Sequence, residues 1–312
     1  MRRITLTLIL GLTCTGLPLL SGCGGGEPAP RRSPVAESGS DEPAAEEPAA
    51  EEPAAEEPTT EEPTVAAAET AEPAEAAKPS AAAAASEVAA DKANFVGRIV
   101  IKGSVPELPP VLKKGTQIKD ALCAEHDIAD ESLVSEGGGL GNVFIFMRKA
   151  PKGVDIPGPP EEPLVLDNKI CAFVPHAAIV QTGQLMLLTN SDPFPHNTHT
   201  NPFKSDPINP LIPGNTTEGL EHKYERAETV PVKTNCDIHP WMLSWHLPVD
   251  HPWATISNPD GTFEIKDIPP GEHEFRIWHE RVGNIEKGVD ITFEPGKVVE
   301  MEFTVDAAEL TE

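Results

Sequence analysis

Short runs of β-branched and aromatic residues recur from residue 94 onward, separated by Pro, Gly, Asn and Asp. This spacing predicts short strands joined by turns, as in a β-sandwich. Only residues 116–124 predict a modest helix. Residues 243–249 alternate apolar and polar positions, which predicts a half-buried strand. Further strands are expected at residues 96–101, 142–147, 178–180, 185–188, 229–232 and 275–278. The predicted fold class is therefore all-β.

The beginning of the chain has the pattern of a targeting segment. Two arginines precede an apolar run, residues 4–20, which small residues and Cys23 follow. This order is typical of a secretory signal peptide. Residues 20–23, Leu-Ser-Gly-Cys, resemble the lipobox of bacterial lipoproteins, which implies that residues 1–22 are removed and that Cys23 is lipidated. We expect an extracytoplasmic protein held by lipid at the outer membrane or cell envelope. The alternatives are a plain signal peptide and a membrane span, although the run is short for a span.

Residues 23–93 are expected to contain the lipidated cysteine and an acidic, disordered linker. A five-residue repeat that begins Asp-Glu-Pro-Ala-Ala covers residues 41–65, and residues 24–92 carry 17 acidic but only 4 basic side chains. Regular prolines and mutual charge repulsion oppose a packed structure. The whole chain has a net charge of −26 and no cluster of Lys or Arg. Nucleic acid is therefore excluded as a main partner.

Two short stretches hold most of the candidate metal ligands. Residues 190–199 contain His196, and residues 235–242 contain Cys236, His239 and Met242. One thiolate, two imidazoles and a thioether are the donors of a blue-copper electron-transfer site. Thiolate and thioether suit Cu(I), and imidazole binds copper in both oxidation states. Because the protein fills every position on the ion, we expect an electron carrier with no catalytic residues rather than an enzyme.

These stretches, with the strand residues that precede them, resemble the copper-binding segments of cupredoxins. The short Cys-x₂-His-x₂-Met loop is most similar to that of amicyanin. The resemblance covers residues 164–249 and implies a Greek-key β-sandwich. It also implies one mononuclear copper site. His196, Cys236 and His239 would be its equatorial ligands, and Met242 would be its axial ligand.

The same resemblance implies supporting roles for the neighbouring residues. Asn197 matches the residue that braces the ligand loops through hydrogen bonds near the thiolate. His199 is expected to support the site or to face solvent. His239, beside Pro240 and Trp241, is expected to be partly exposed and to pass electrons to a redox partner, whose identity the sequence does not indicate.

Zinc is the rival metal. His196-x₂-His199 and Cys236-x₂-His239 supply four donors at spacings typical of zinc sites. That alternative leaves the methionine and the asparagine without a role. A zinc-bound or metal-free surface interaction module is one remaining functional class, and a copper carrier is another.

Two cysteines, Cys123 and Cys171, remain once Cys14 is removed with the signal peptide and Cys23 and Cys236 are assigned to lipid and metal. In an oxidising compartment such a pair suggests a disulfide. The alternative is a second metal site built from Cys123-x₂-His126 and Cys171-x₄-His176.

Residues 254–280 read as strands separated by an Asp260-Gly261 turn and a Pro-Pro-Gly turn. They resemble the later half of the carboxypeptidase regulatory-like (transthyretin-like) β-sandwich, and strands upstream of residue 148 resemble its earlier half. The resemblance implies a discontinuous sandwich of residues 94–163 and 250–306, into which the cupredoxin-like segment is inserted. Insertion is easy where the two chain ends lie close together. We expect this sandwich to serve as a scaffold.

Overall fold

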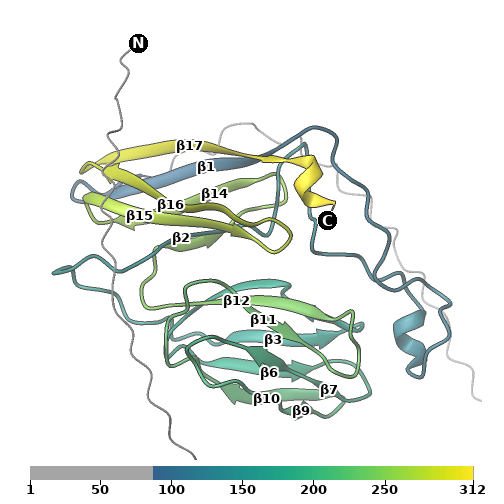
Figure 1. Ribbon diagram of the computed structural model, residues 1–312. Coiled ribbons are helices and arrows are strands. Elements are labelled where there is room, and N and C mark those ends of the chain that lie inside the picture. Colours follow the sequence, from purple (N-terminus) through teal and green to yellow (C-terminus); the bar gives the residue numbers. More distant parts are fainter. Residues whose placement is uncertain (1–86, 312) are drawn as a thin grey trace, which may run out of the picture. The chain divides into compact units, whose positions relative to one another are not determined.

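The computed structural model describes residues 87–311 of the chain, and the structural statements below refer to these residues (Figure 1). The predicted signal peptide, Cys23 and most of the predicted linker lie outside this range. The expected helix at residues 116–124 is reduced to the 3₁₀ helix η1 (Ala121–Ala124), and a second one, η2 (Ala307–Leu310), follows the last strand. In the described range, neither helix has the length or apolarity that crossing a bilayer requires. The remaining regular structure consists of strands, which confirms the all-β prediction.

Seven strands from the two ends of the described chain form one sandwich, which we call the split sandwich (Figure 1). One sheet has the order β14–β1–β17, and the other has the order β13–β2–β15–β16. β1 runs parallel to β17 and antiparallel to β14, while β2 pairs with β13 and β15. Both early strands therefore pair with late strands. Their bounds are β1 (Ala93–Lys102), β2 (Phe144–Met147), β13 (Ala254–Ile256), β14 (Thr262–Ile268), β15 (Gly271–His279), β16 (Gly283–Phe293) and β17 (Lys297–Asp306).

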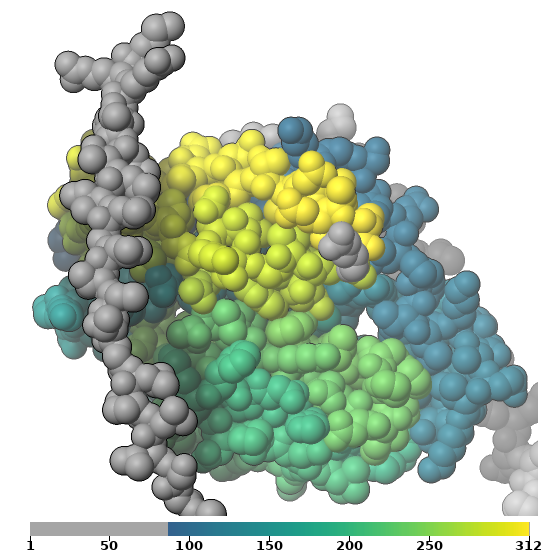
Figure 2. Space-filling model, viewed as in Figure 1, coloured from purple at the N-terminus to yellow at the C-terminus, as the bar shows by residue number. Residues whose placement is uncertain are grey.

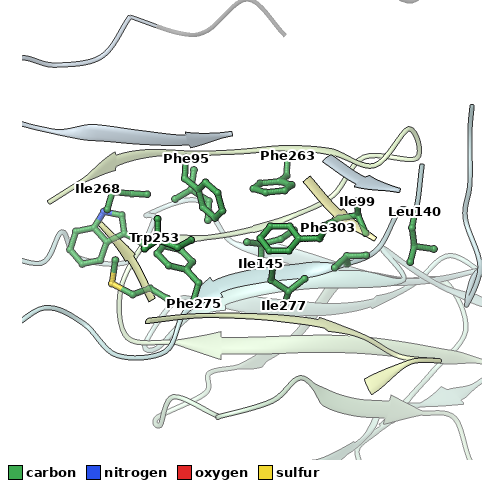
Figure 3. Packing of buried hydrophobic residues seen from close by; sticks show 14 of the residues in the cluster. Phe95, Ile99, Leu140, Ile145, Trp253, Phe263, Ile268, Phe275, Ile277 and Phe303 are labelled. Atoms are coloured by element: carbon green, nitrogen blue, oxygen red, sulfur yellow. The ribbon is translucent and has the colours of Figure 1, made fainter. Parts of the chain in front are cut away.

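The core between the two sheets of the split sandwich contains both phenylalanine rings and aliphatic side chains (Figure 3). Phe95 of β1 is fully buried. Its ring makes edge-to-face contacts with the rings of Phe263, Phe275 and Phe293, at centroid distances of 5.1, 5.3 and 6.0 Å. Edge-to-face geometry is favourable because the positive edge of one ring meets the negative face of another. Phe95 thus packs against side chains from both sheets.

The Asp260-Gly261 turn carries the chain from one sheet to the other, and does not join two paired strands as a hairpin would. β13 pairs with β2, whereas β14 pairs with β1. Gly261 has a φ of +83°, and a Cβ there would lie 2.1 Å from the carbonyl oxygen of Ile99. The Asp260 carboxylate accepts hydrogen bonds from the N–H and the hydroxyl of Thr262 at 3.0 and 2.6 Å. Glycine is required here because the turn passes close to the backbone of β1.

Residues 164–249 form a second sandwich, which we call the inserted sandwich. Its sheets have the orders β10–β6–β3–β4 and β5–β12–β11–β8, with a small sheet β7–β9. The N–H of Met147 donates to the carbonyl of Trp253 at 3.0 Å, so the chain leaves and re-enters the split sandwich at neighbouring points. β11 begins three residues later than the start expected from the sequence. The strands are β3 (Leu164–Lys169), β4 (Ala172–Val174), β5 (Ala177–Gln181), β6 (Met186–Asn190), β7 (His196–Asn197), β8 (His199–Asn201), β9 (Leu211–Ile212), β10 (Thr216–His222), β11 (Val232–Asn235) and β12 (Leu243–Val249).

Both faces of β12 are buried, so the expectation of a half-buried strand is wrong. Leu247 and Val249 pack in an apolar cluster with Phe144 of the split sandwich. His246, which points to the opposite face, is fully buried, and its Nδ1 lies 3.2 Å from the Tyr224 hydroxyl. The apolar residues of β12 therefore join the two sandwiches, while the polar ones face the core of the inserted sandwich.

Replacing Phe95 with alanine should lower the free energy of unfolding of the split sandwich by about 3–5 kcal/mol, because it removes a fully buried ring and leaves a cavity. Urea denaturation measures the change. Val298→Ala in β17 is the control, since this side chain is 38% exposed and its loss should cost less than about 0.5 kcal/mol. A loss below about 1 kcal/mol for Phe95→Ala would show that this core is not packed as described.

Candidate metal centre

Two segments of the inserted sandwich carry the candidate ligands. His196 is the first residue of β7, and the loop between β11 and β12 carries Cys236, His239 and Met242. Within this loop the N–H of Met242 donates to the carbonyl of His239 at 2.9 Å, and the N–H of Cys236 donates to the carbonyl of Met242 at 3.3 Å. These backbone bonds fold the loop back on itself. All four side chains are buried.

The two imidazoles converge on the thiol of Cys236. Its Sγ lies 3.9 Å from Nδ1 of His196 and 3.8 Å from Nδ1 of His239. Metal–sulfur and metal–nitrogen bonds of about 2.3 and 2.0 Å, set about 120° apart, separate sulfur from nitrogen by about 3.7 Å. The three donors therefore fit one thiophilic metal ion. Met242 packs in the same buried cluster as Cys236, where its thioether is available as a further soft donor.

A carboxylate contacts the remote nitrogen of each imidazole. Asp192 Oδ2 lies 2.9 Å from Nε2 of His196, and Asp120 Oδ2 lies 3.1 Å from Nε2 of His239. Because an ionised carboxylate only accepts hydrogen bonds, each Nε2 carries the proton and each Nδ1 presents a lone pair toward the thiol. The carboxylates thus select the tautomer that binds metal. Neither carboxylate was among the site residues expected from the sequence.

The turn before β4 holds Asp192 in place. The N–H groups of Ile170 and Cys171 donate to its carboxylate at 2.7 and 2.8 Å. These two residues have φ values of +50° and +55°, a backbone shape that can direct successive N–H groups at one anion. Burial raises the pKa of Asp192, but the hydrogen bonds from His196 and the two amides outweigh burial and hold this pKa below its usual value.

Asn197 links the two ligand segments, where the resemblance places a bracing residue. Its Oδ1 accepts a hydrogen bond from the N–H of Asp237 at 2.8 Å and lies 3.4 Å from Cys236 Sγ. Its Nδ2 donates to Asn209 at 2.6 Å. His199 lies apart from the three donors: its side chain is 36% exposed and its Nδ1 lies 3.1 Å from the Asp237 carboxylate. The ligand atoms of His196, Cys236 and His239 lie within 4.8 Å of one another, and His199 does not belong to this group.

His239 is only 3% exposed, so the expectation of a partly exposed ligand is wrong. Asp120 occupies the position beside its Nε2. The rings of Phe194 and Trp241 lie against the imidazole, with centroids at 5.7 and 5.2 Å. Asp120 belongs to the long connection between β1 and β2, in which no residue of this site was expected from the sequence. Within residues 87–311, these groups therefore cover almost all of the imidazole of His239.

Cys123 and Cys171 are joined by a disulfide, with their Cα atoms 5.5 Å apart. With the disulfide formed, neither sulfur is a thiolate that could join the alternative metal site with His126 and His176. His176 Nε2 instead contacts the carboxylate of Glu280.

No protein-family model matches the chain, and no curated protein matches it. Among solved structures it is similar to a mutant of amicyanin in the Cu(I) form, at 16% identity and a TM-score of 0.25, over 28% of this chain and 81% of that chain. It is similar to a copper-containing nitrite reductase from Thermus scotoductus, at 16% identity and a TM-score of 0.26, over 32% and 25% of the two chains. A purple cupredoxin from Nitrosopumilus maritimus gives 21% identity and a TM-score of 0.23, over 28% and 98%. The metal-binding character of the site is supported by its geometry and not by these similarities.

The thiol of Cys236 should titrate well below a normal cysteine in metal-free protein. Burial raises its pKa, but His196 and His239, when protonated at both ring nitrogens, donate from Nδ1 to the sulfur, and these hydrogen bonds outweigh burial and lower the pKa to about 6. Ultraviolet absorbance of the thiolate should therefore rise with a midpoint near pH 6. An unfolded cysteine titrates near 8.5, so the thiolate should stabilise the fold fully above about pH 8.5, and this stabilisation should disappear as the pH falls through about 6.

His196→Gln serves as the matched variant for this titration, because it removes one of the two imidazoles and should move the midpoint upward. A midpoint near 8.5 in the folded parent protein would contradict the described contacts.

Proposed function

We propose that this chain is a lipid-anchored, extracytoplasmic blue-copper protein that relays single electrons. The observation that supports it most is the convergence of two imidazole Nδ1 atoms on one buried thiol, at 3.9 and 3.8 Å. A thiolate suits Cu(I), and imidazole binds copper in both oxidation states, so this donor set can retain the ion when its charge changes.

His196, Cys236 and His239 would hold the copper, and Met242 would supply a weak fourth donor. Bound copper supplies one-electron chemistry. The chain holds both imidazoles in the tautomer that presents Nδ1, and it buries the donors away from water. Donors held in this way before the metal arrives need little rearrangement when the ion gains or loses an electron.

An electron carrier fits this site better than an enzyme. Catalytic metal sites keep a position open for water or substrate. Here four protein donors come from two short segments and are buried. The split sandwich would act as a scaffold that covers β12.

The lipid anchor is proposed from the Leu-Ser-Gly-Cys sequence at residues 20–23. Two or more acyl chains hold a protein stably at a membrane, whereas one chain gives marginal binding. The acidic repeat between residues 41 and 65 would then act as a spacer.

Cys236→Ser should abolish the intense visible absorption of the copper-loaded, oxidised protein, because the colour requires a copper–thiolate bond. Met242→Leu is the matched variant: it should keep the colour and raise the reduction potential, since the axial donor tunes this potential. An absorption spectrum and a redox titration measure the two effects. Equal colour in Cys236→Ser and the parent would show that the ligand assignment is wrong.

The same preparations separate the other functional classes. Elemental analysis that finds zinc and no copper in the purified protein would favour the interaction module. Rapid copper exchange without a reversible redox wave would favour a copper carrier.

Cys23→Ser should move the protein from the membrane fraction of the producing bacterium to the soluble extracytoplasmic fraction, because it removes the acceptor of the lipid. Cell fractionation and immunoblotting measure this change. Unchanged membrane association in the variant would contradict the proposed anchor.

A further inference from the structure

Residues 103–131 connect β1 of the split sandwich to the region before β2, yet they pack against the inserted sandwich. Figure 2 shows this part of the chain, in blue, lying against the green inserted sandwich. Leu112 and Ile128 form an antiparallel bridge and are buried in the same apolar cluster as Cys236 and Met242. We refer to residues 103–131 as the cover segment.

Asp120 has a fixed position within the cover segment. It caps η1, and the N–H of Cys123 donates to its carbonyl at 3.1 Å. Cys123 in turn is bonded to Cys171 of the inserted sandwich. The disulfide therefore holds the turn that carries Asp120 directly beside the metal centre.

The partner cysteine belongs to the framework that holds both imidazoles. The N–H of Cys171 donates to Asp192, which contacts His196, and the carbonyl of Cys171 accepts a hydrogen bond from the Trp241 indole at 3.1 Å. The Trp241 ring lies against His239. The disulfide thus ties Asp120 to the residue that contacts both Asp192, beside His196, and Trp241, beside His239.

We propose that Asp120 is a positioning residue for the metal ligand His239, and that the cover segment keeps its carboxylate on the imidazole whether the ion is monovalent or divalent. This inference rests on the proposed copper site and deepens it. The carboxylate fixes the proton on Nε2 and increases the basicity of the ligand atom Nδ1. Its negative charge favours the divalent ion over the monovalent one. The cover segment also separates this edge of the site from water, since the Asp120 side chain is 21% exposed and that of His239 only 4%.

Two substitutions separate the charge of Asp120 from its hydrogen bond. Asp120→Asn keeps an oxygen that accepts from Nε2 but removes the charge, whereas Asp120→Ala removes both. The control is Asp127→Asn, because Asp127 belongs to the same cover segment and accepts from the Lys114 N–H at 2.8 Å without contacting a ligand. The full chain is used throughout.

In the zinc-loaded chain, affinity for zinc(II) should fall about tenfold in Asp120→Asn and up to about a hundredfold in Asp120→Ala. In the copper-loaded chain, Asp120→Asn should lower the ratio of the Cu(II) to the Cu(I) binding constant about tenfold, which raises the reduction potential by about 59 mV. The Nε2 proton of His239, observed by NMR in the zinc-loaded chain, should exchange with solvent faster in Asp120→Ala. Asp127→Asn should match the parent in all three measurements.

Zinc affinity, potential and proton exchange that are the same in Asp120→Ala and Asp127→Asn would overturn the inference. The zinc measurements test the role of Asp120 independently of the proposed copper function. A parent protein that gives no thiolate colour with copper would overturn the copper site, while the zinc affinities of the Asp120 variants would still decide the role of this residue.

Discussion

The rest of the candidate metal centre depends on the two imidazole Nδ1 atoms that face the thiol of Cys236. Burying a thiol and two imidazoles is unfavourable unless each polar atom finds a partner. Here the partners also impose direction. Asp192 and Asp120 accept from the two Nε2 atoms, which leaves both Nδ1 atoms to face the sulfur, and Asn197 joins the cysteine to the preceding ligand segment. The polar contacts that make burial tolerable are therefore the same ones that shape the site.

The two sandwiches make different contributions to this arrangement. The inserted sandwich supplies His196 and the loop from Cys236 to Met242, and its strand β12 packs on the split sandwich through Leu247 and Val249. The split sandwich contributes indirectly, because the connection between two of its strands crosses to the metal centre and brings Asp120 there. A disulfide holds that connection in place. Residues that are distant in the sequence thus share one buried network.

Much of the site was predictable because its residues lie in short segments with a recognisable donor set. Cys236, His239 and Met242 fall within seven residues, and Asn197 follows His196 directly. Asp192 lies four residues before His196, so its contact with this histidine had a local signal in the sequence. The contact between Asp120 and His239 had no local signal, because the two residues are 119 positions apart in the sequence. The position of Asp120 follows from the disulfide and from the packing of the cover segment. Likewise, the pattern of β12 shows alternation but not that a second sandwich buries its apolar face.

X-ray absorption at the copper edge of the copper-loaded protein tests the central claim most directly, because it reports which atoms surround the ion. We predict one short sulfur distance and two nitrogen distances from imidazole in both oxidation states, with at most a longer second sulfur. A copper ion bound by nitrogen and oxygen alone, without the Cys236 sulfur, would contradict the account.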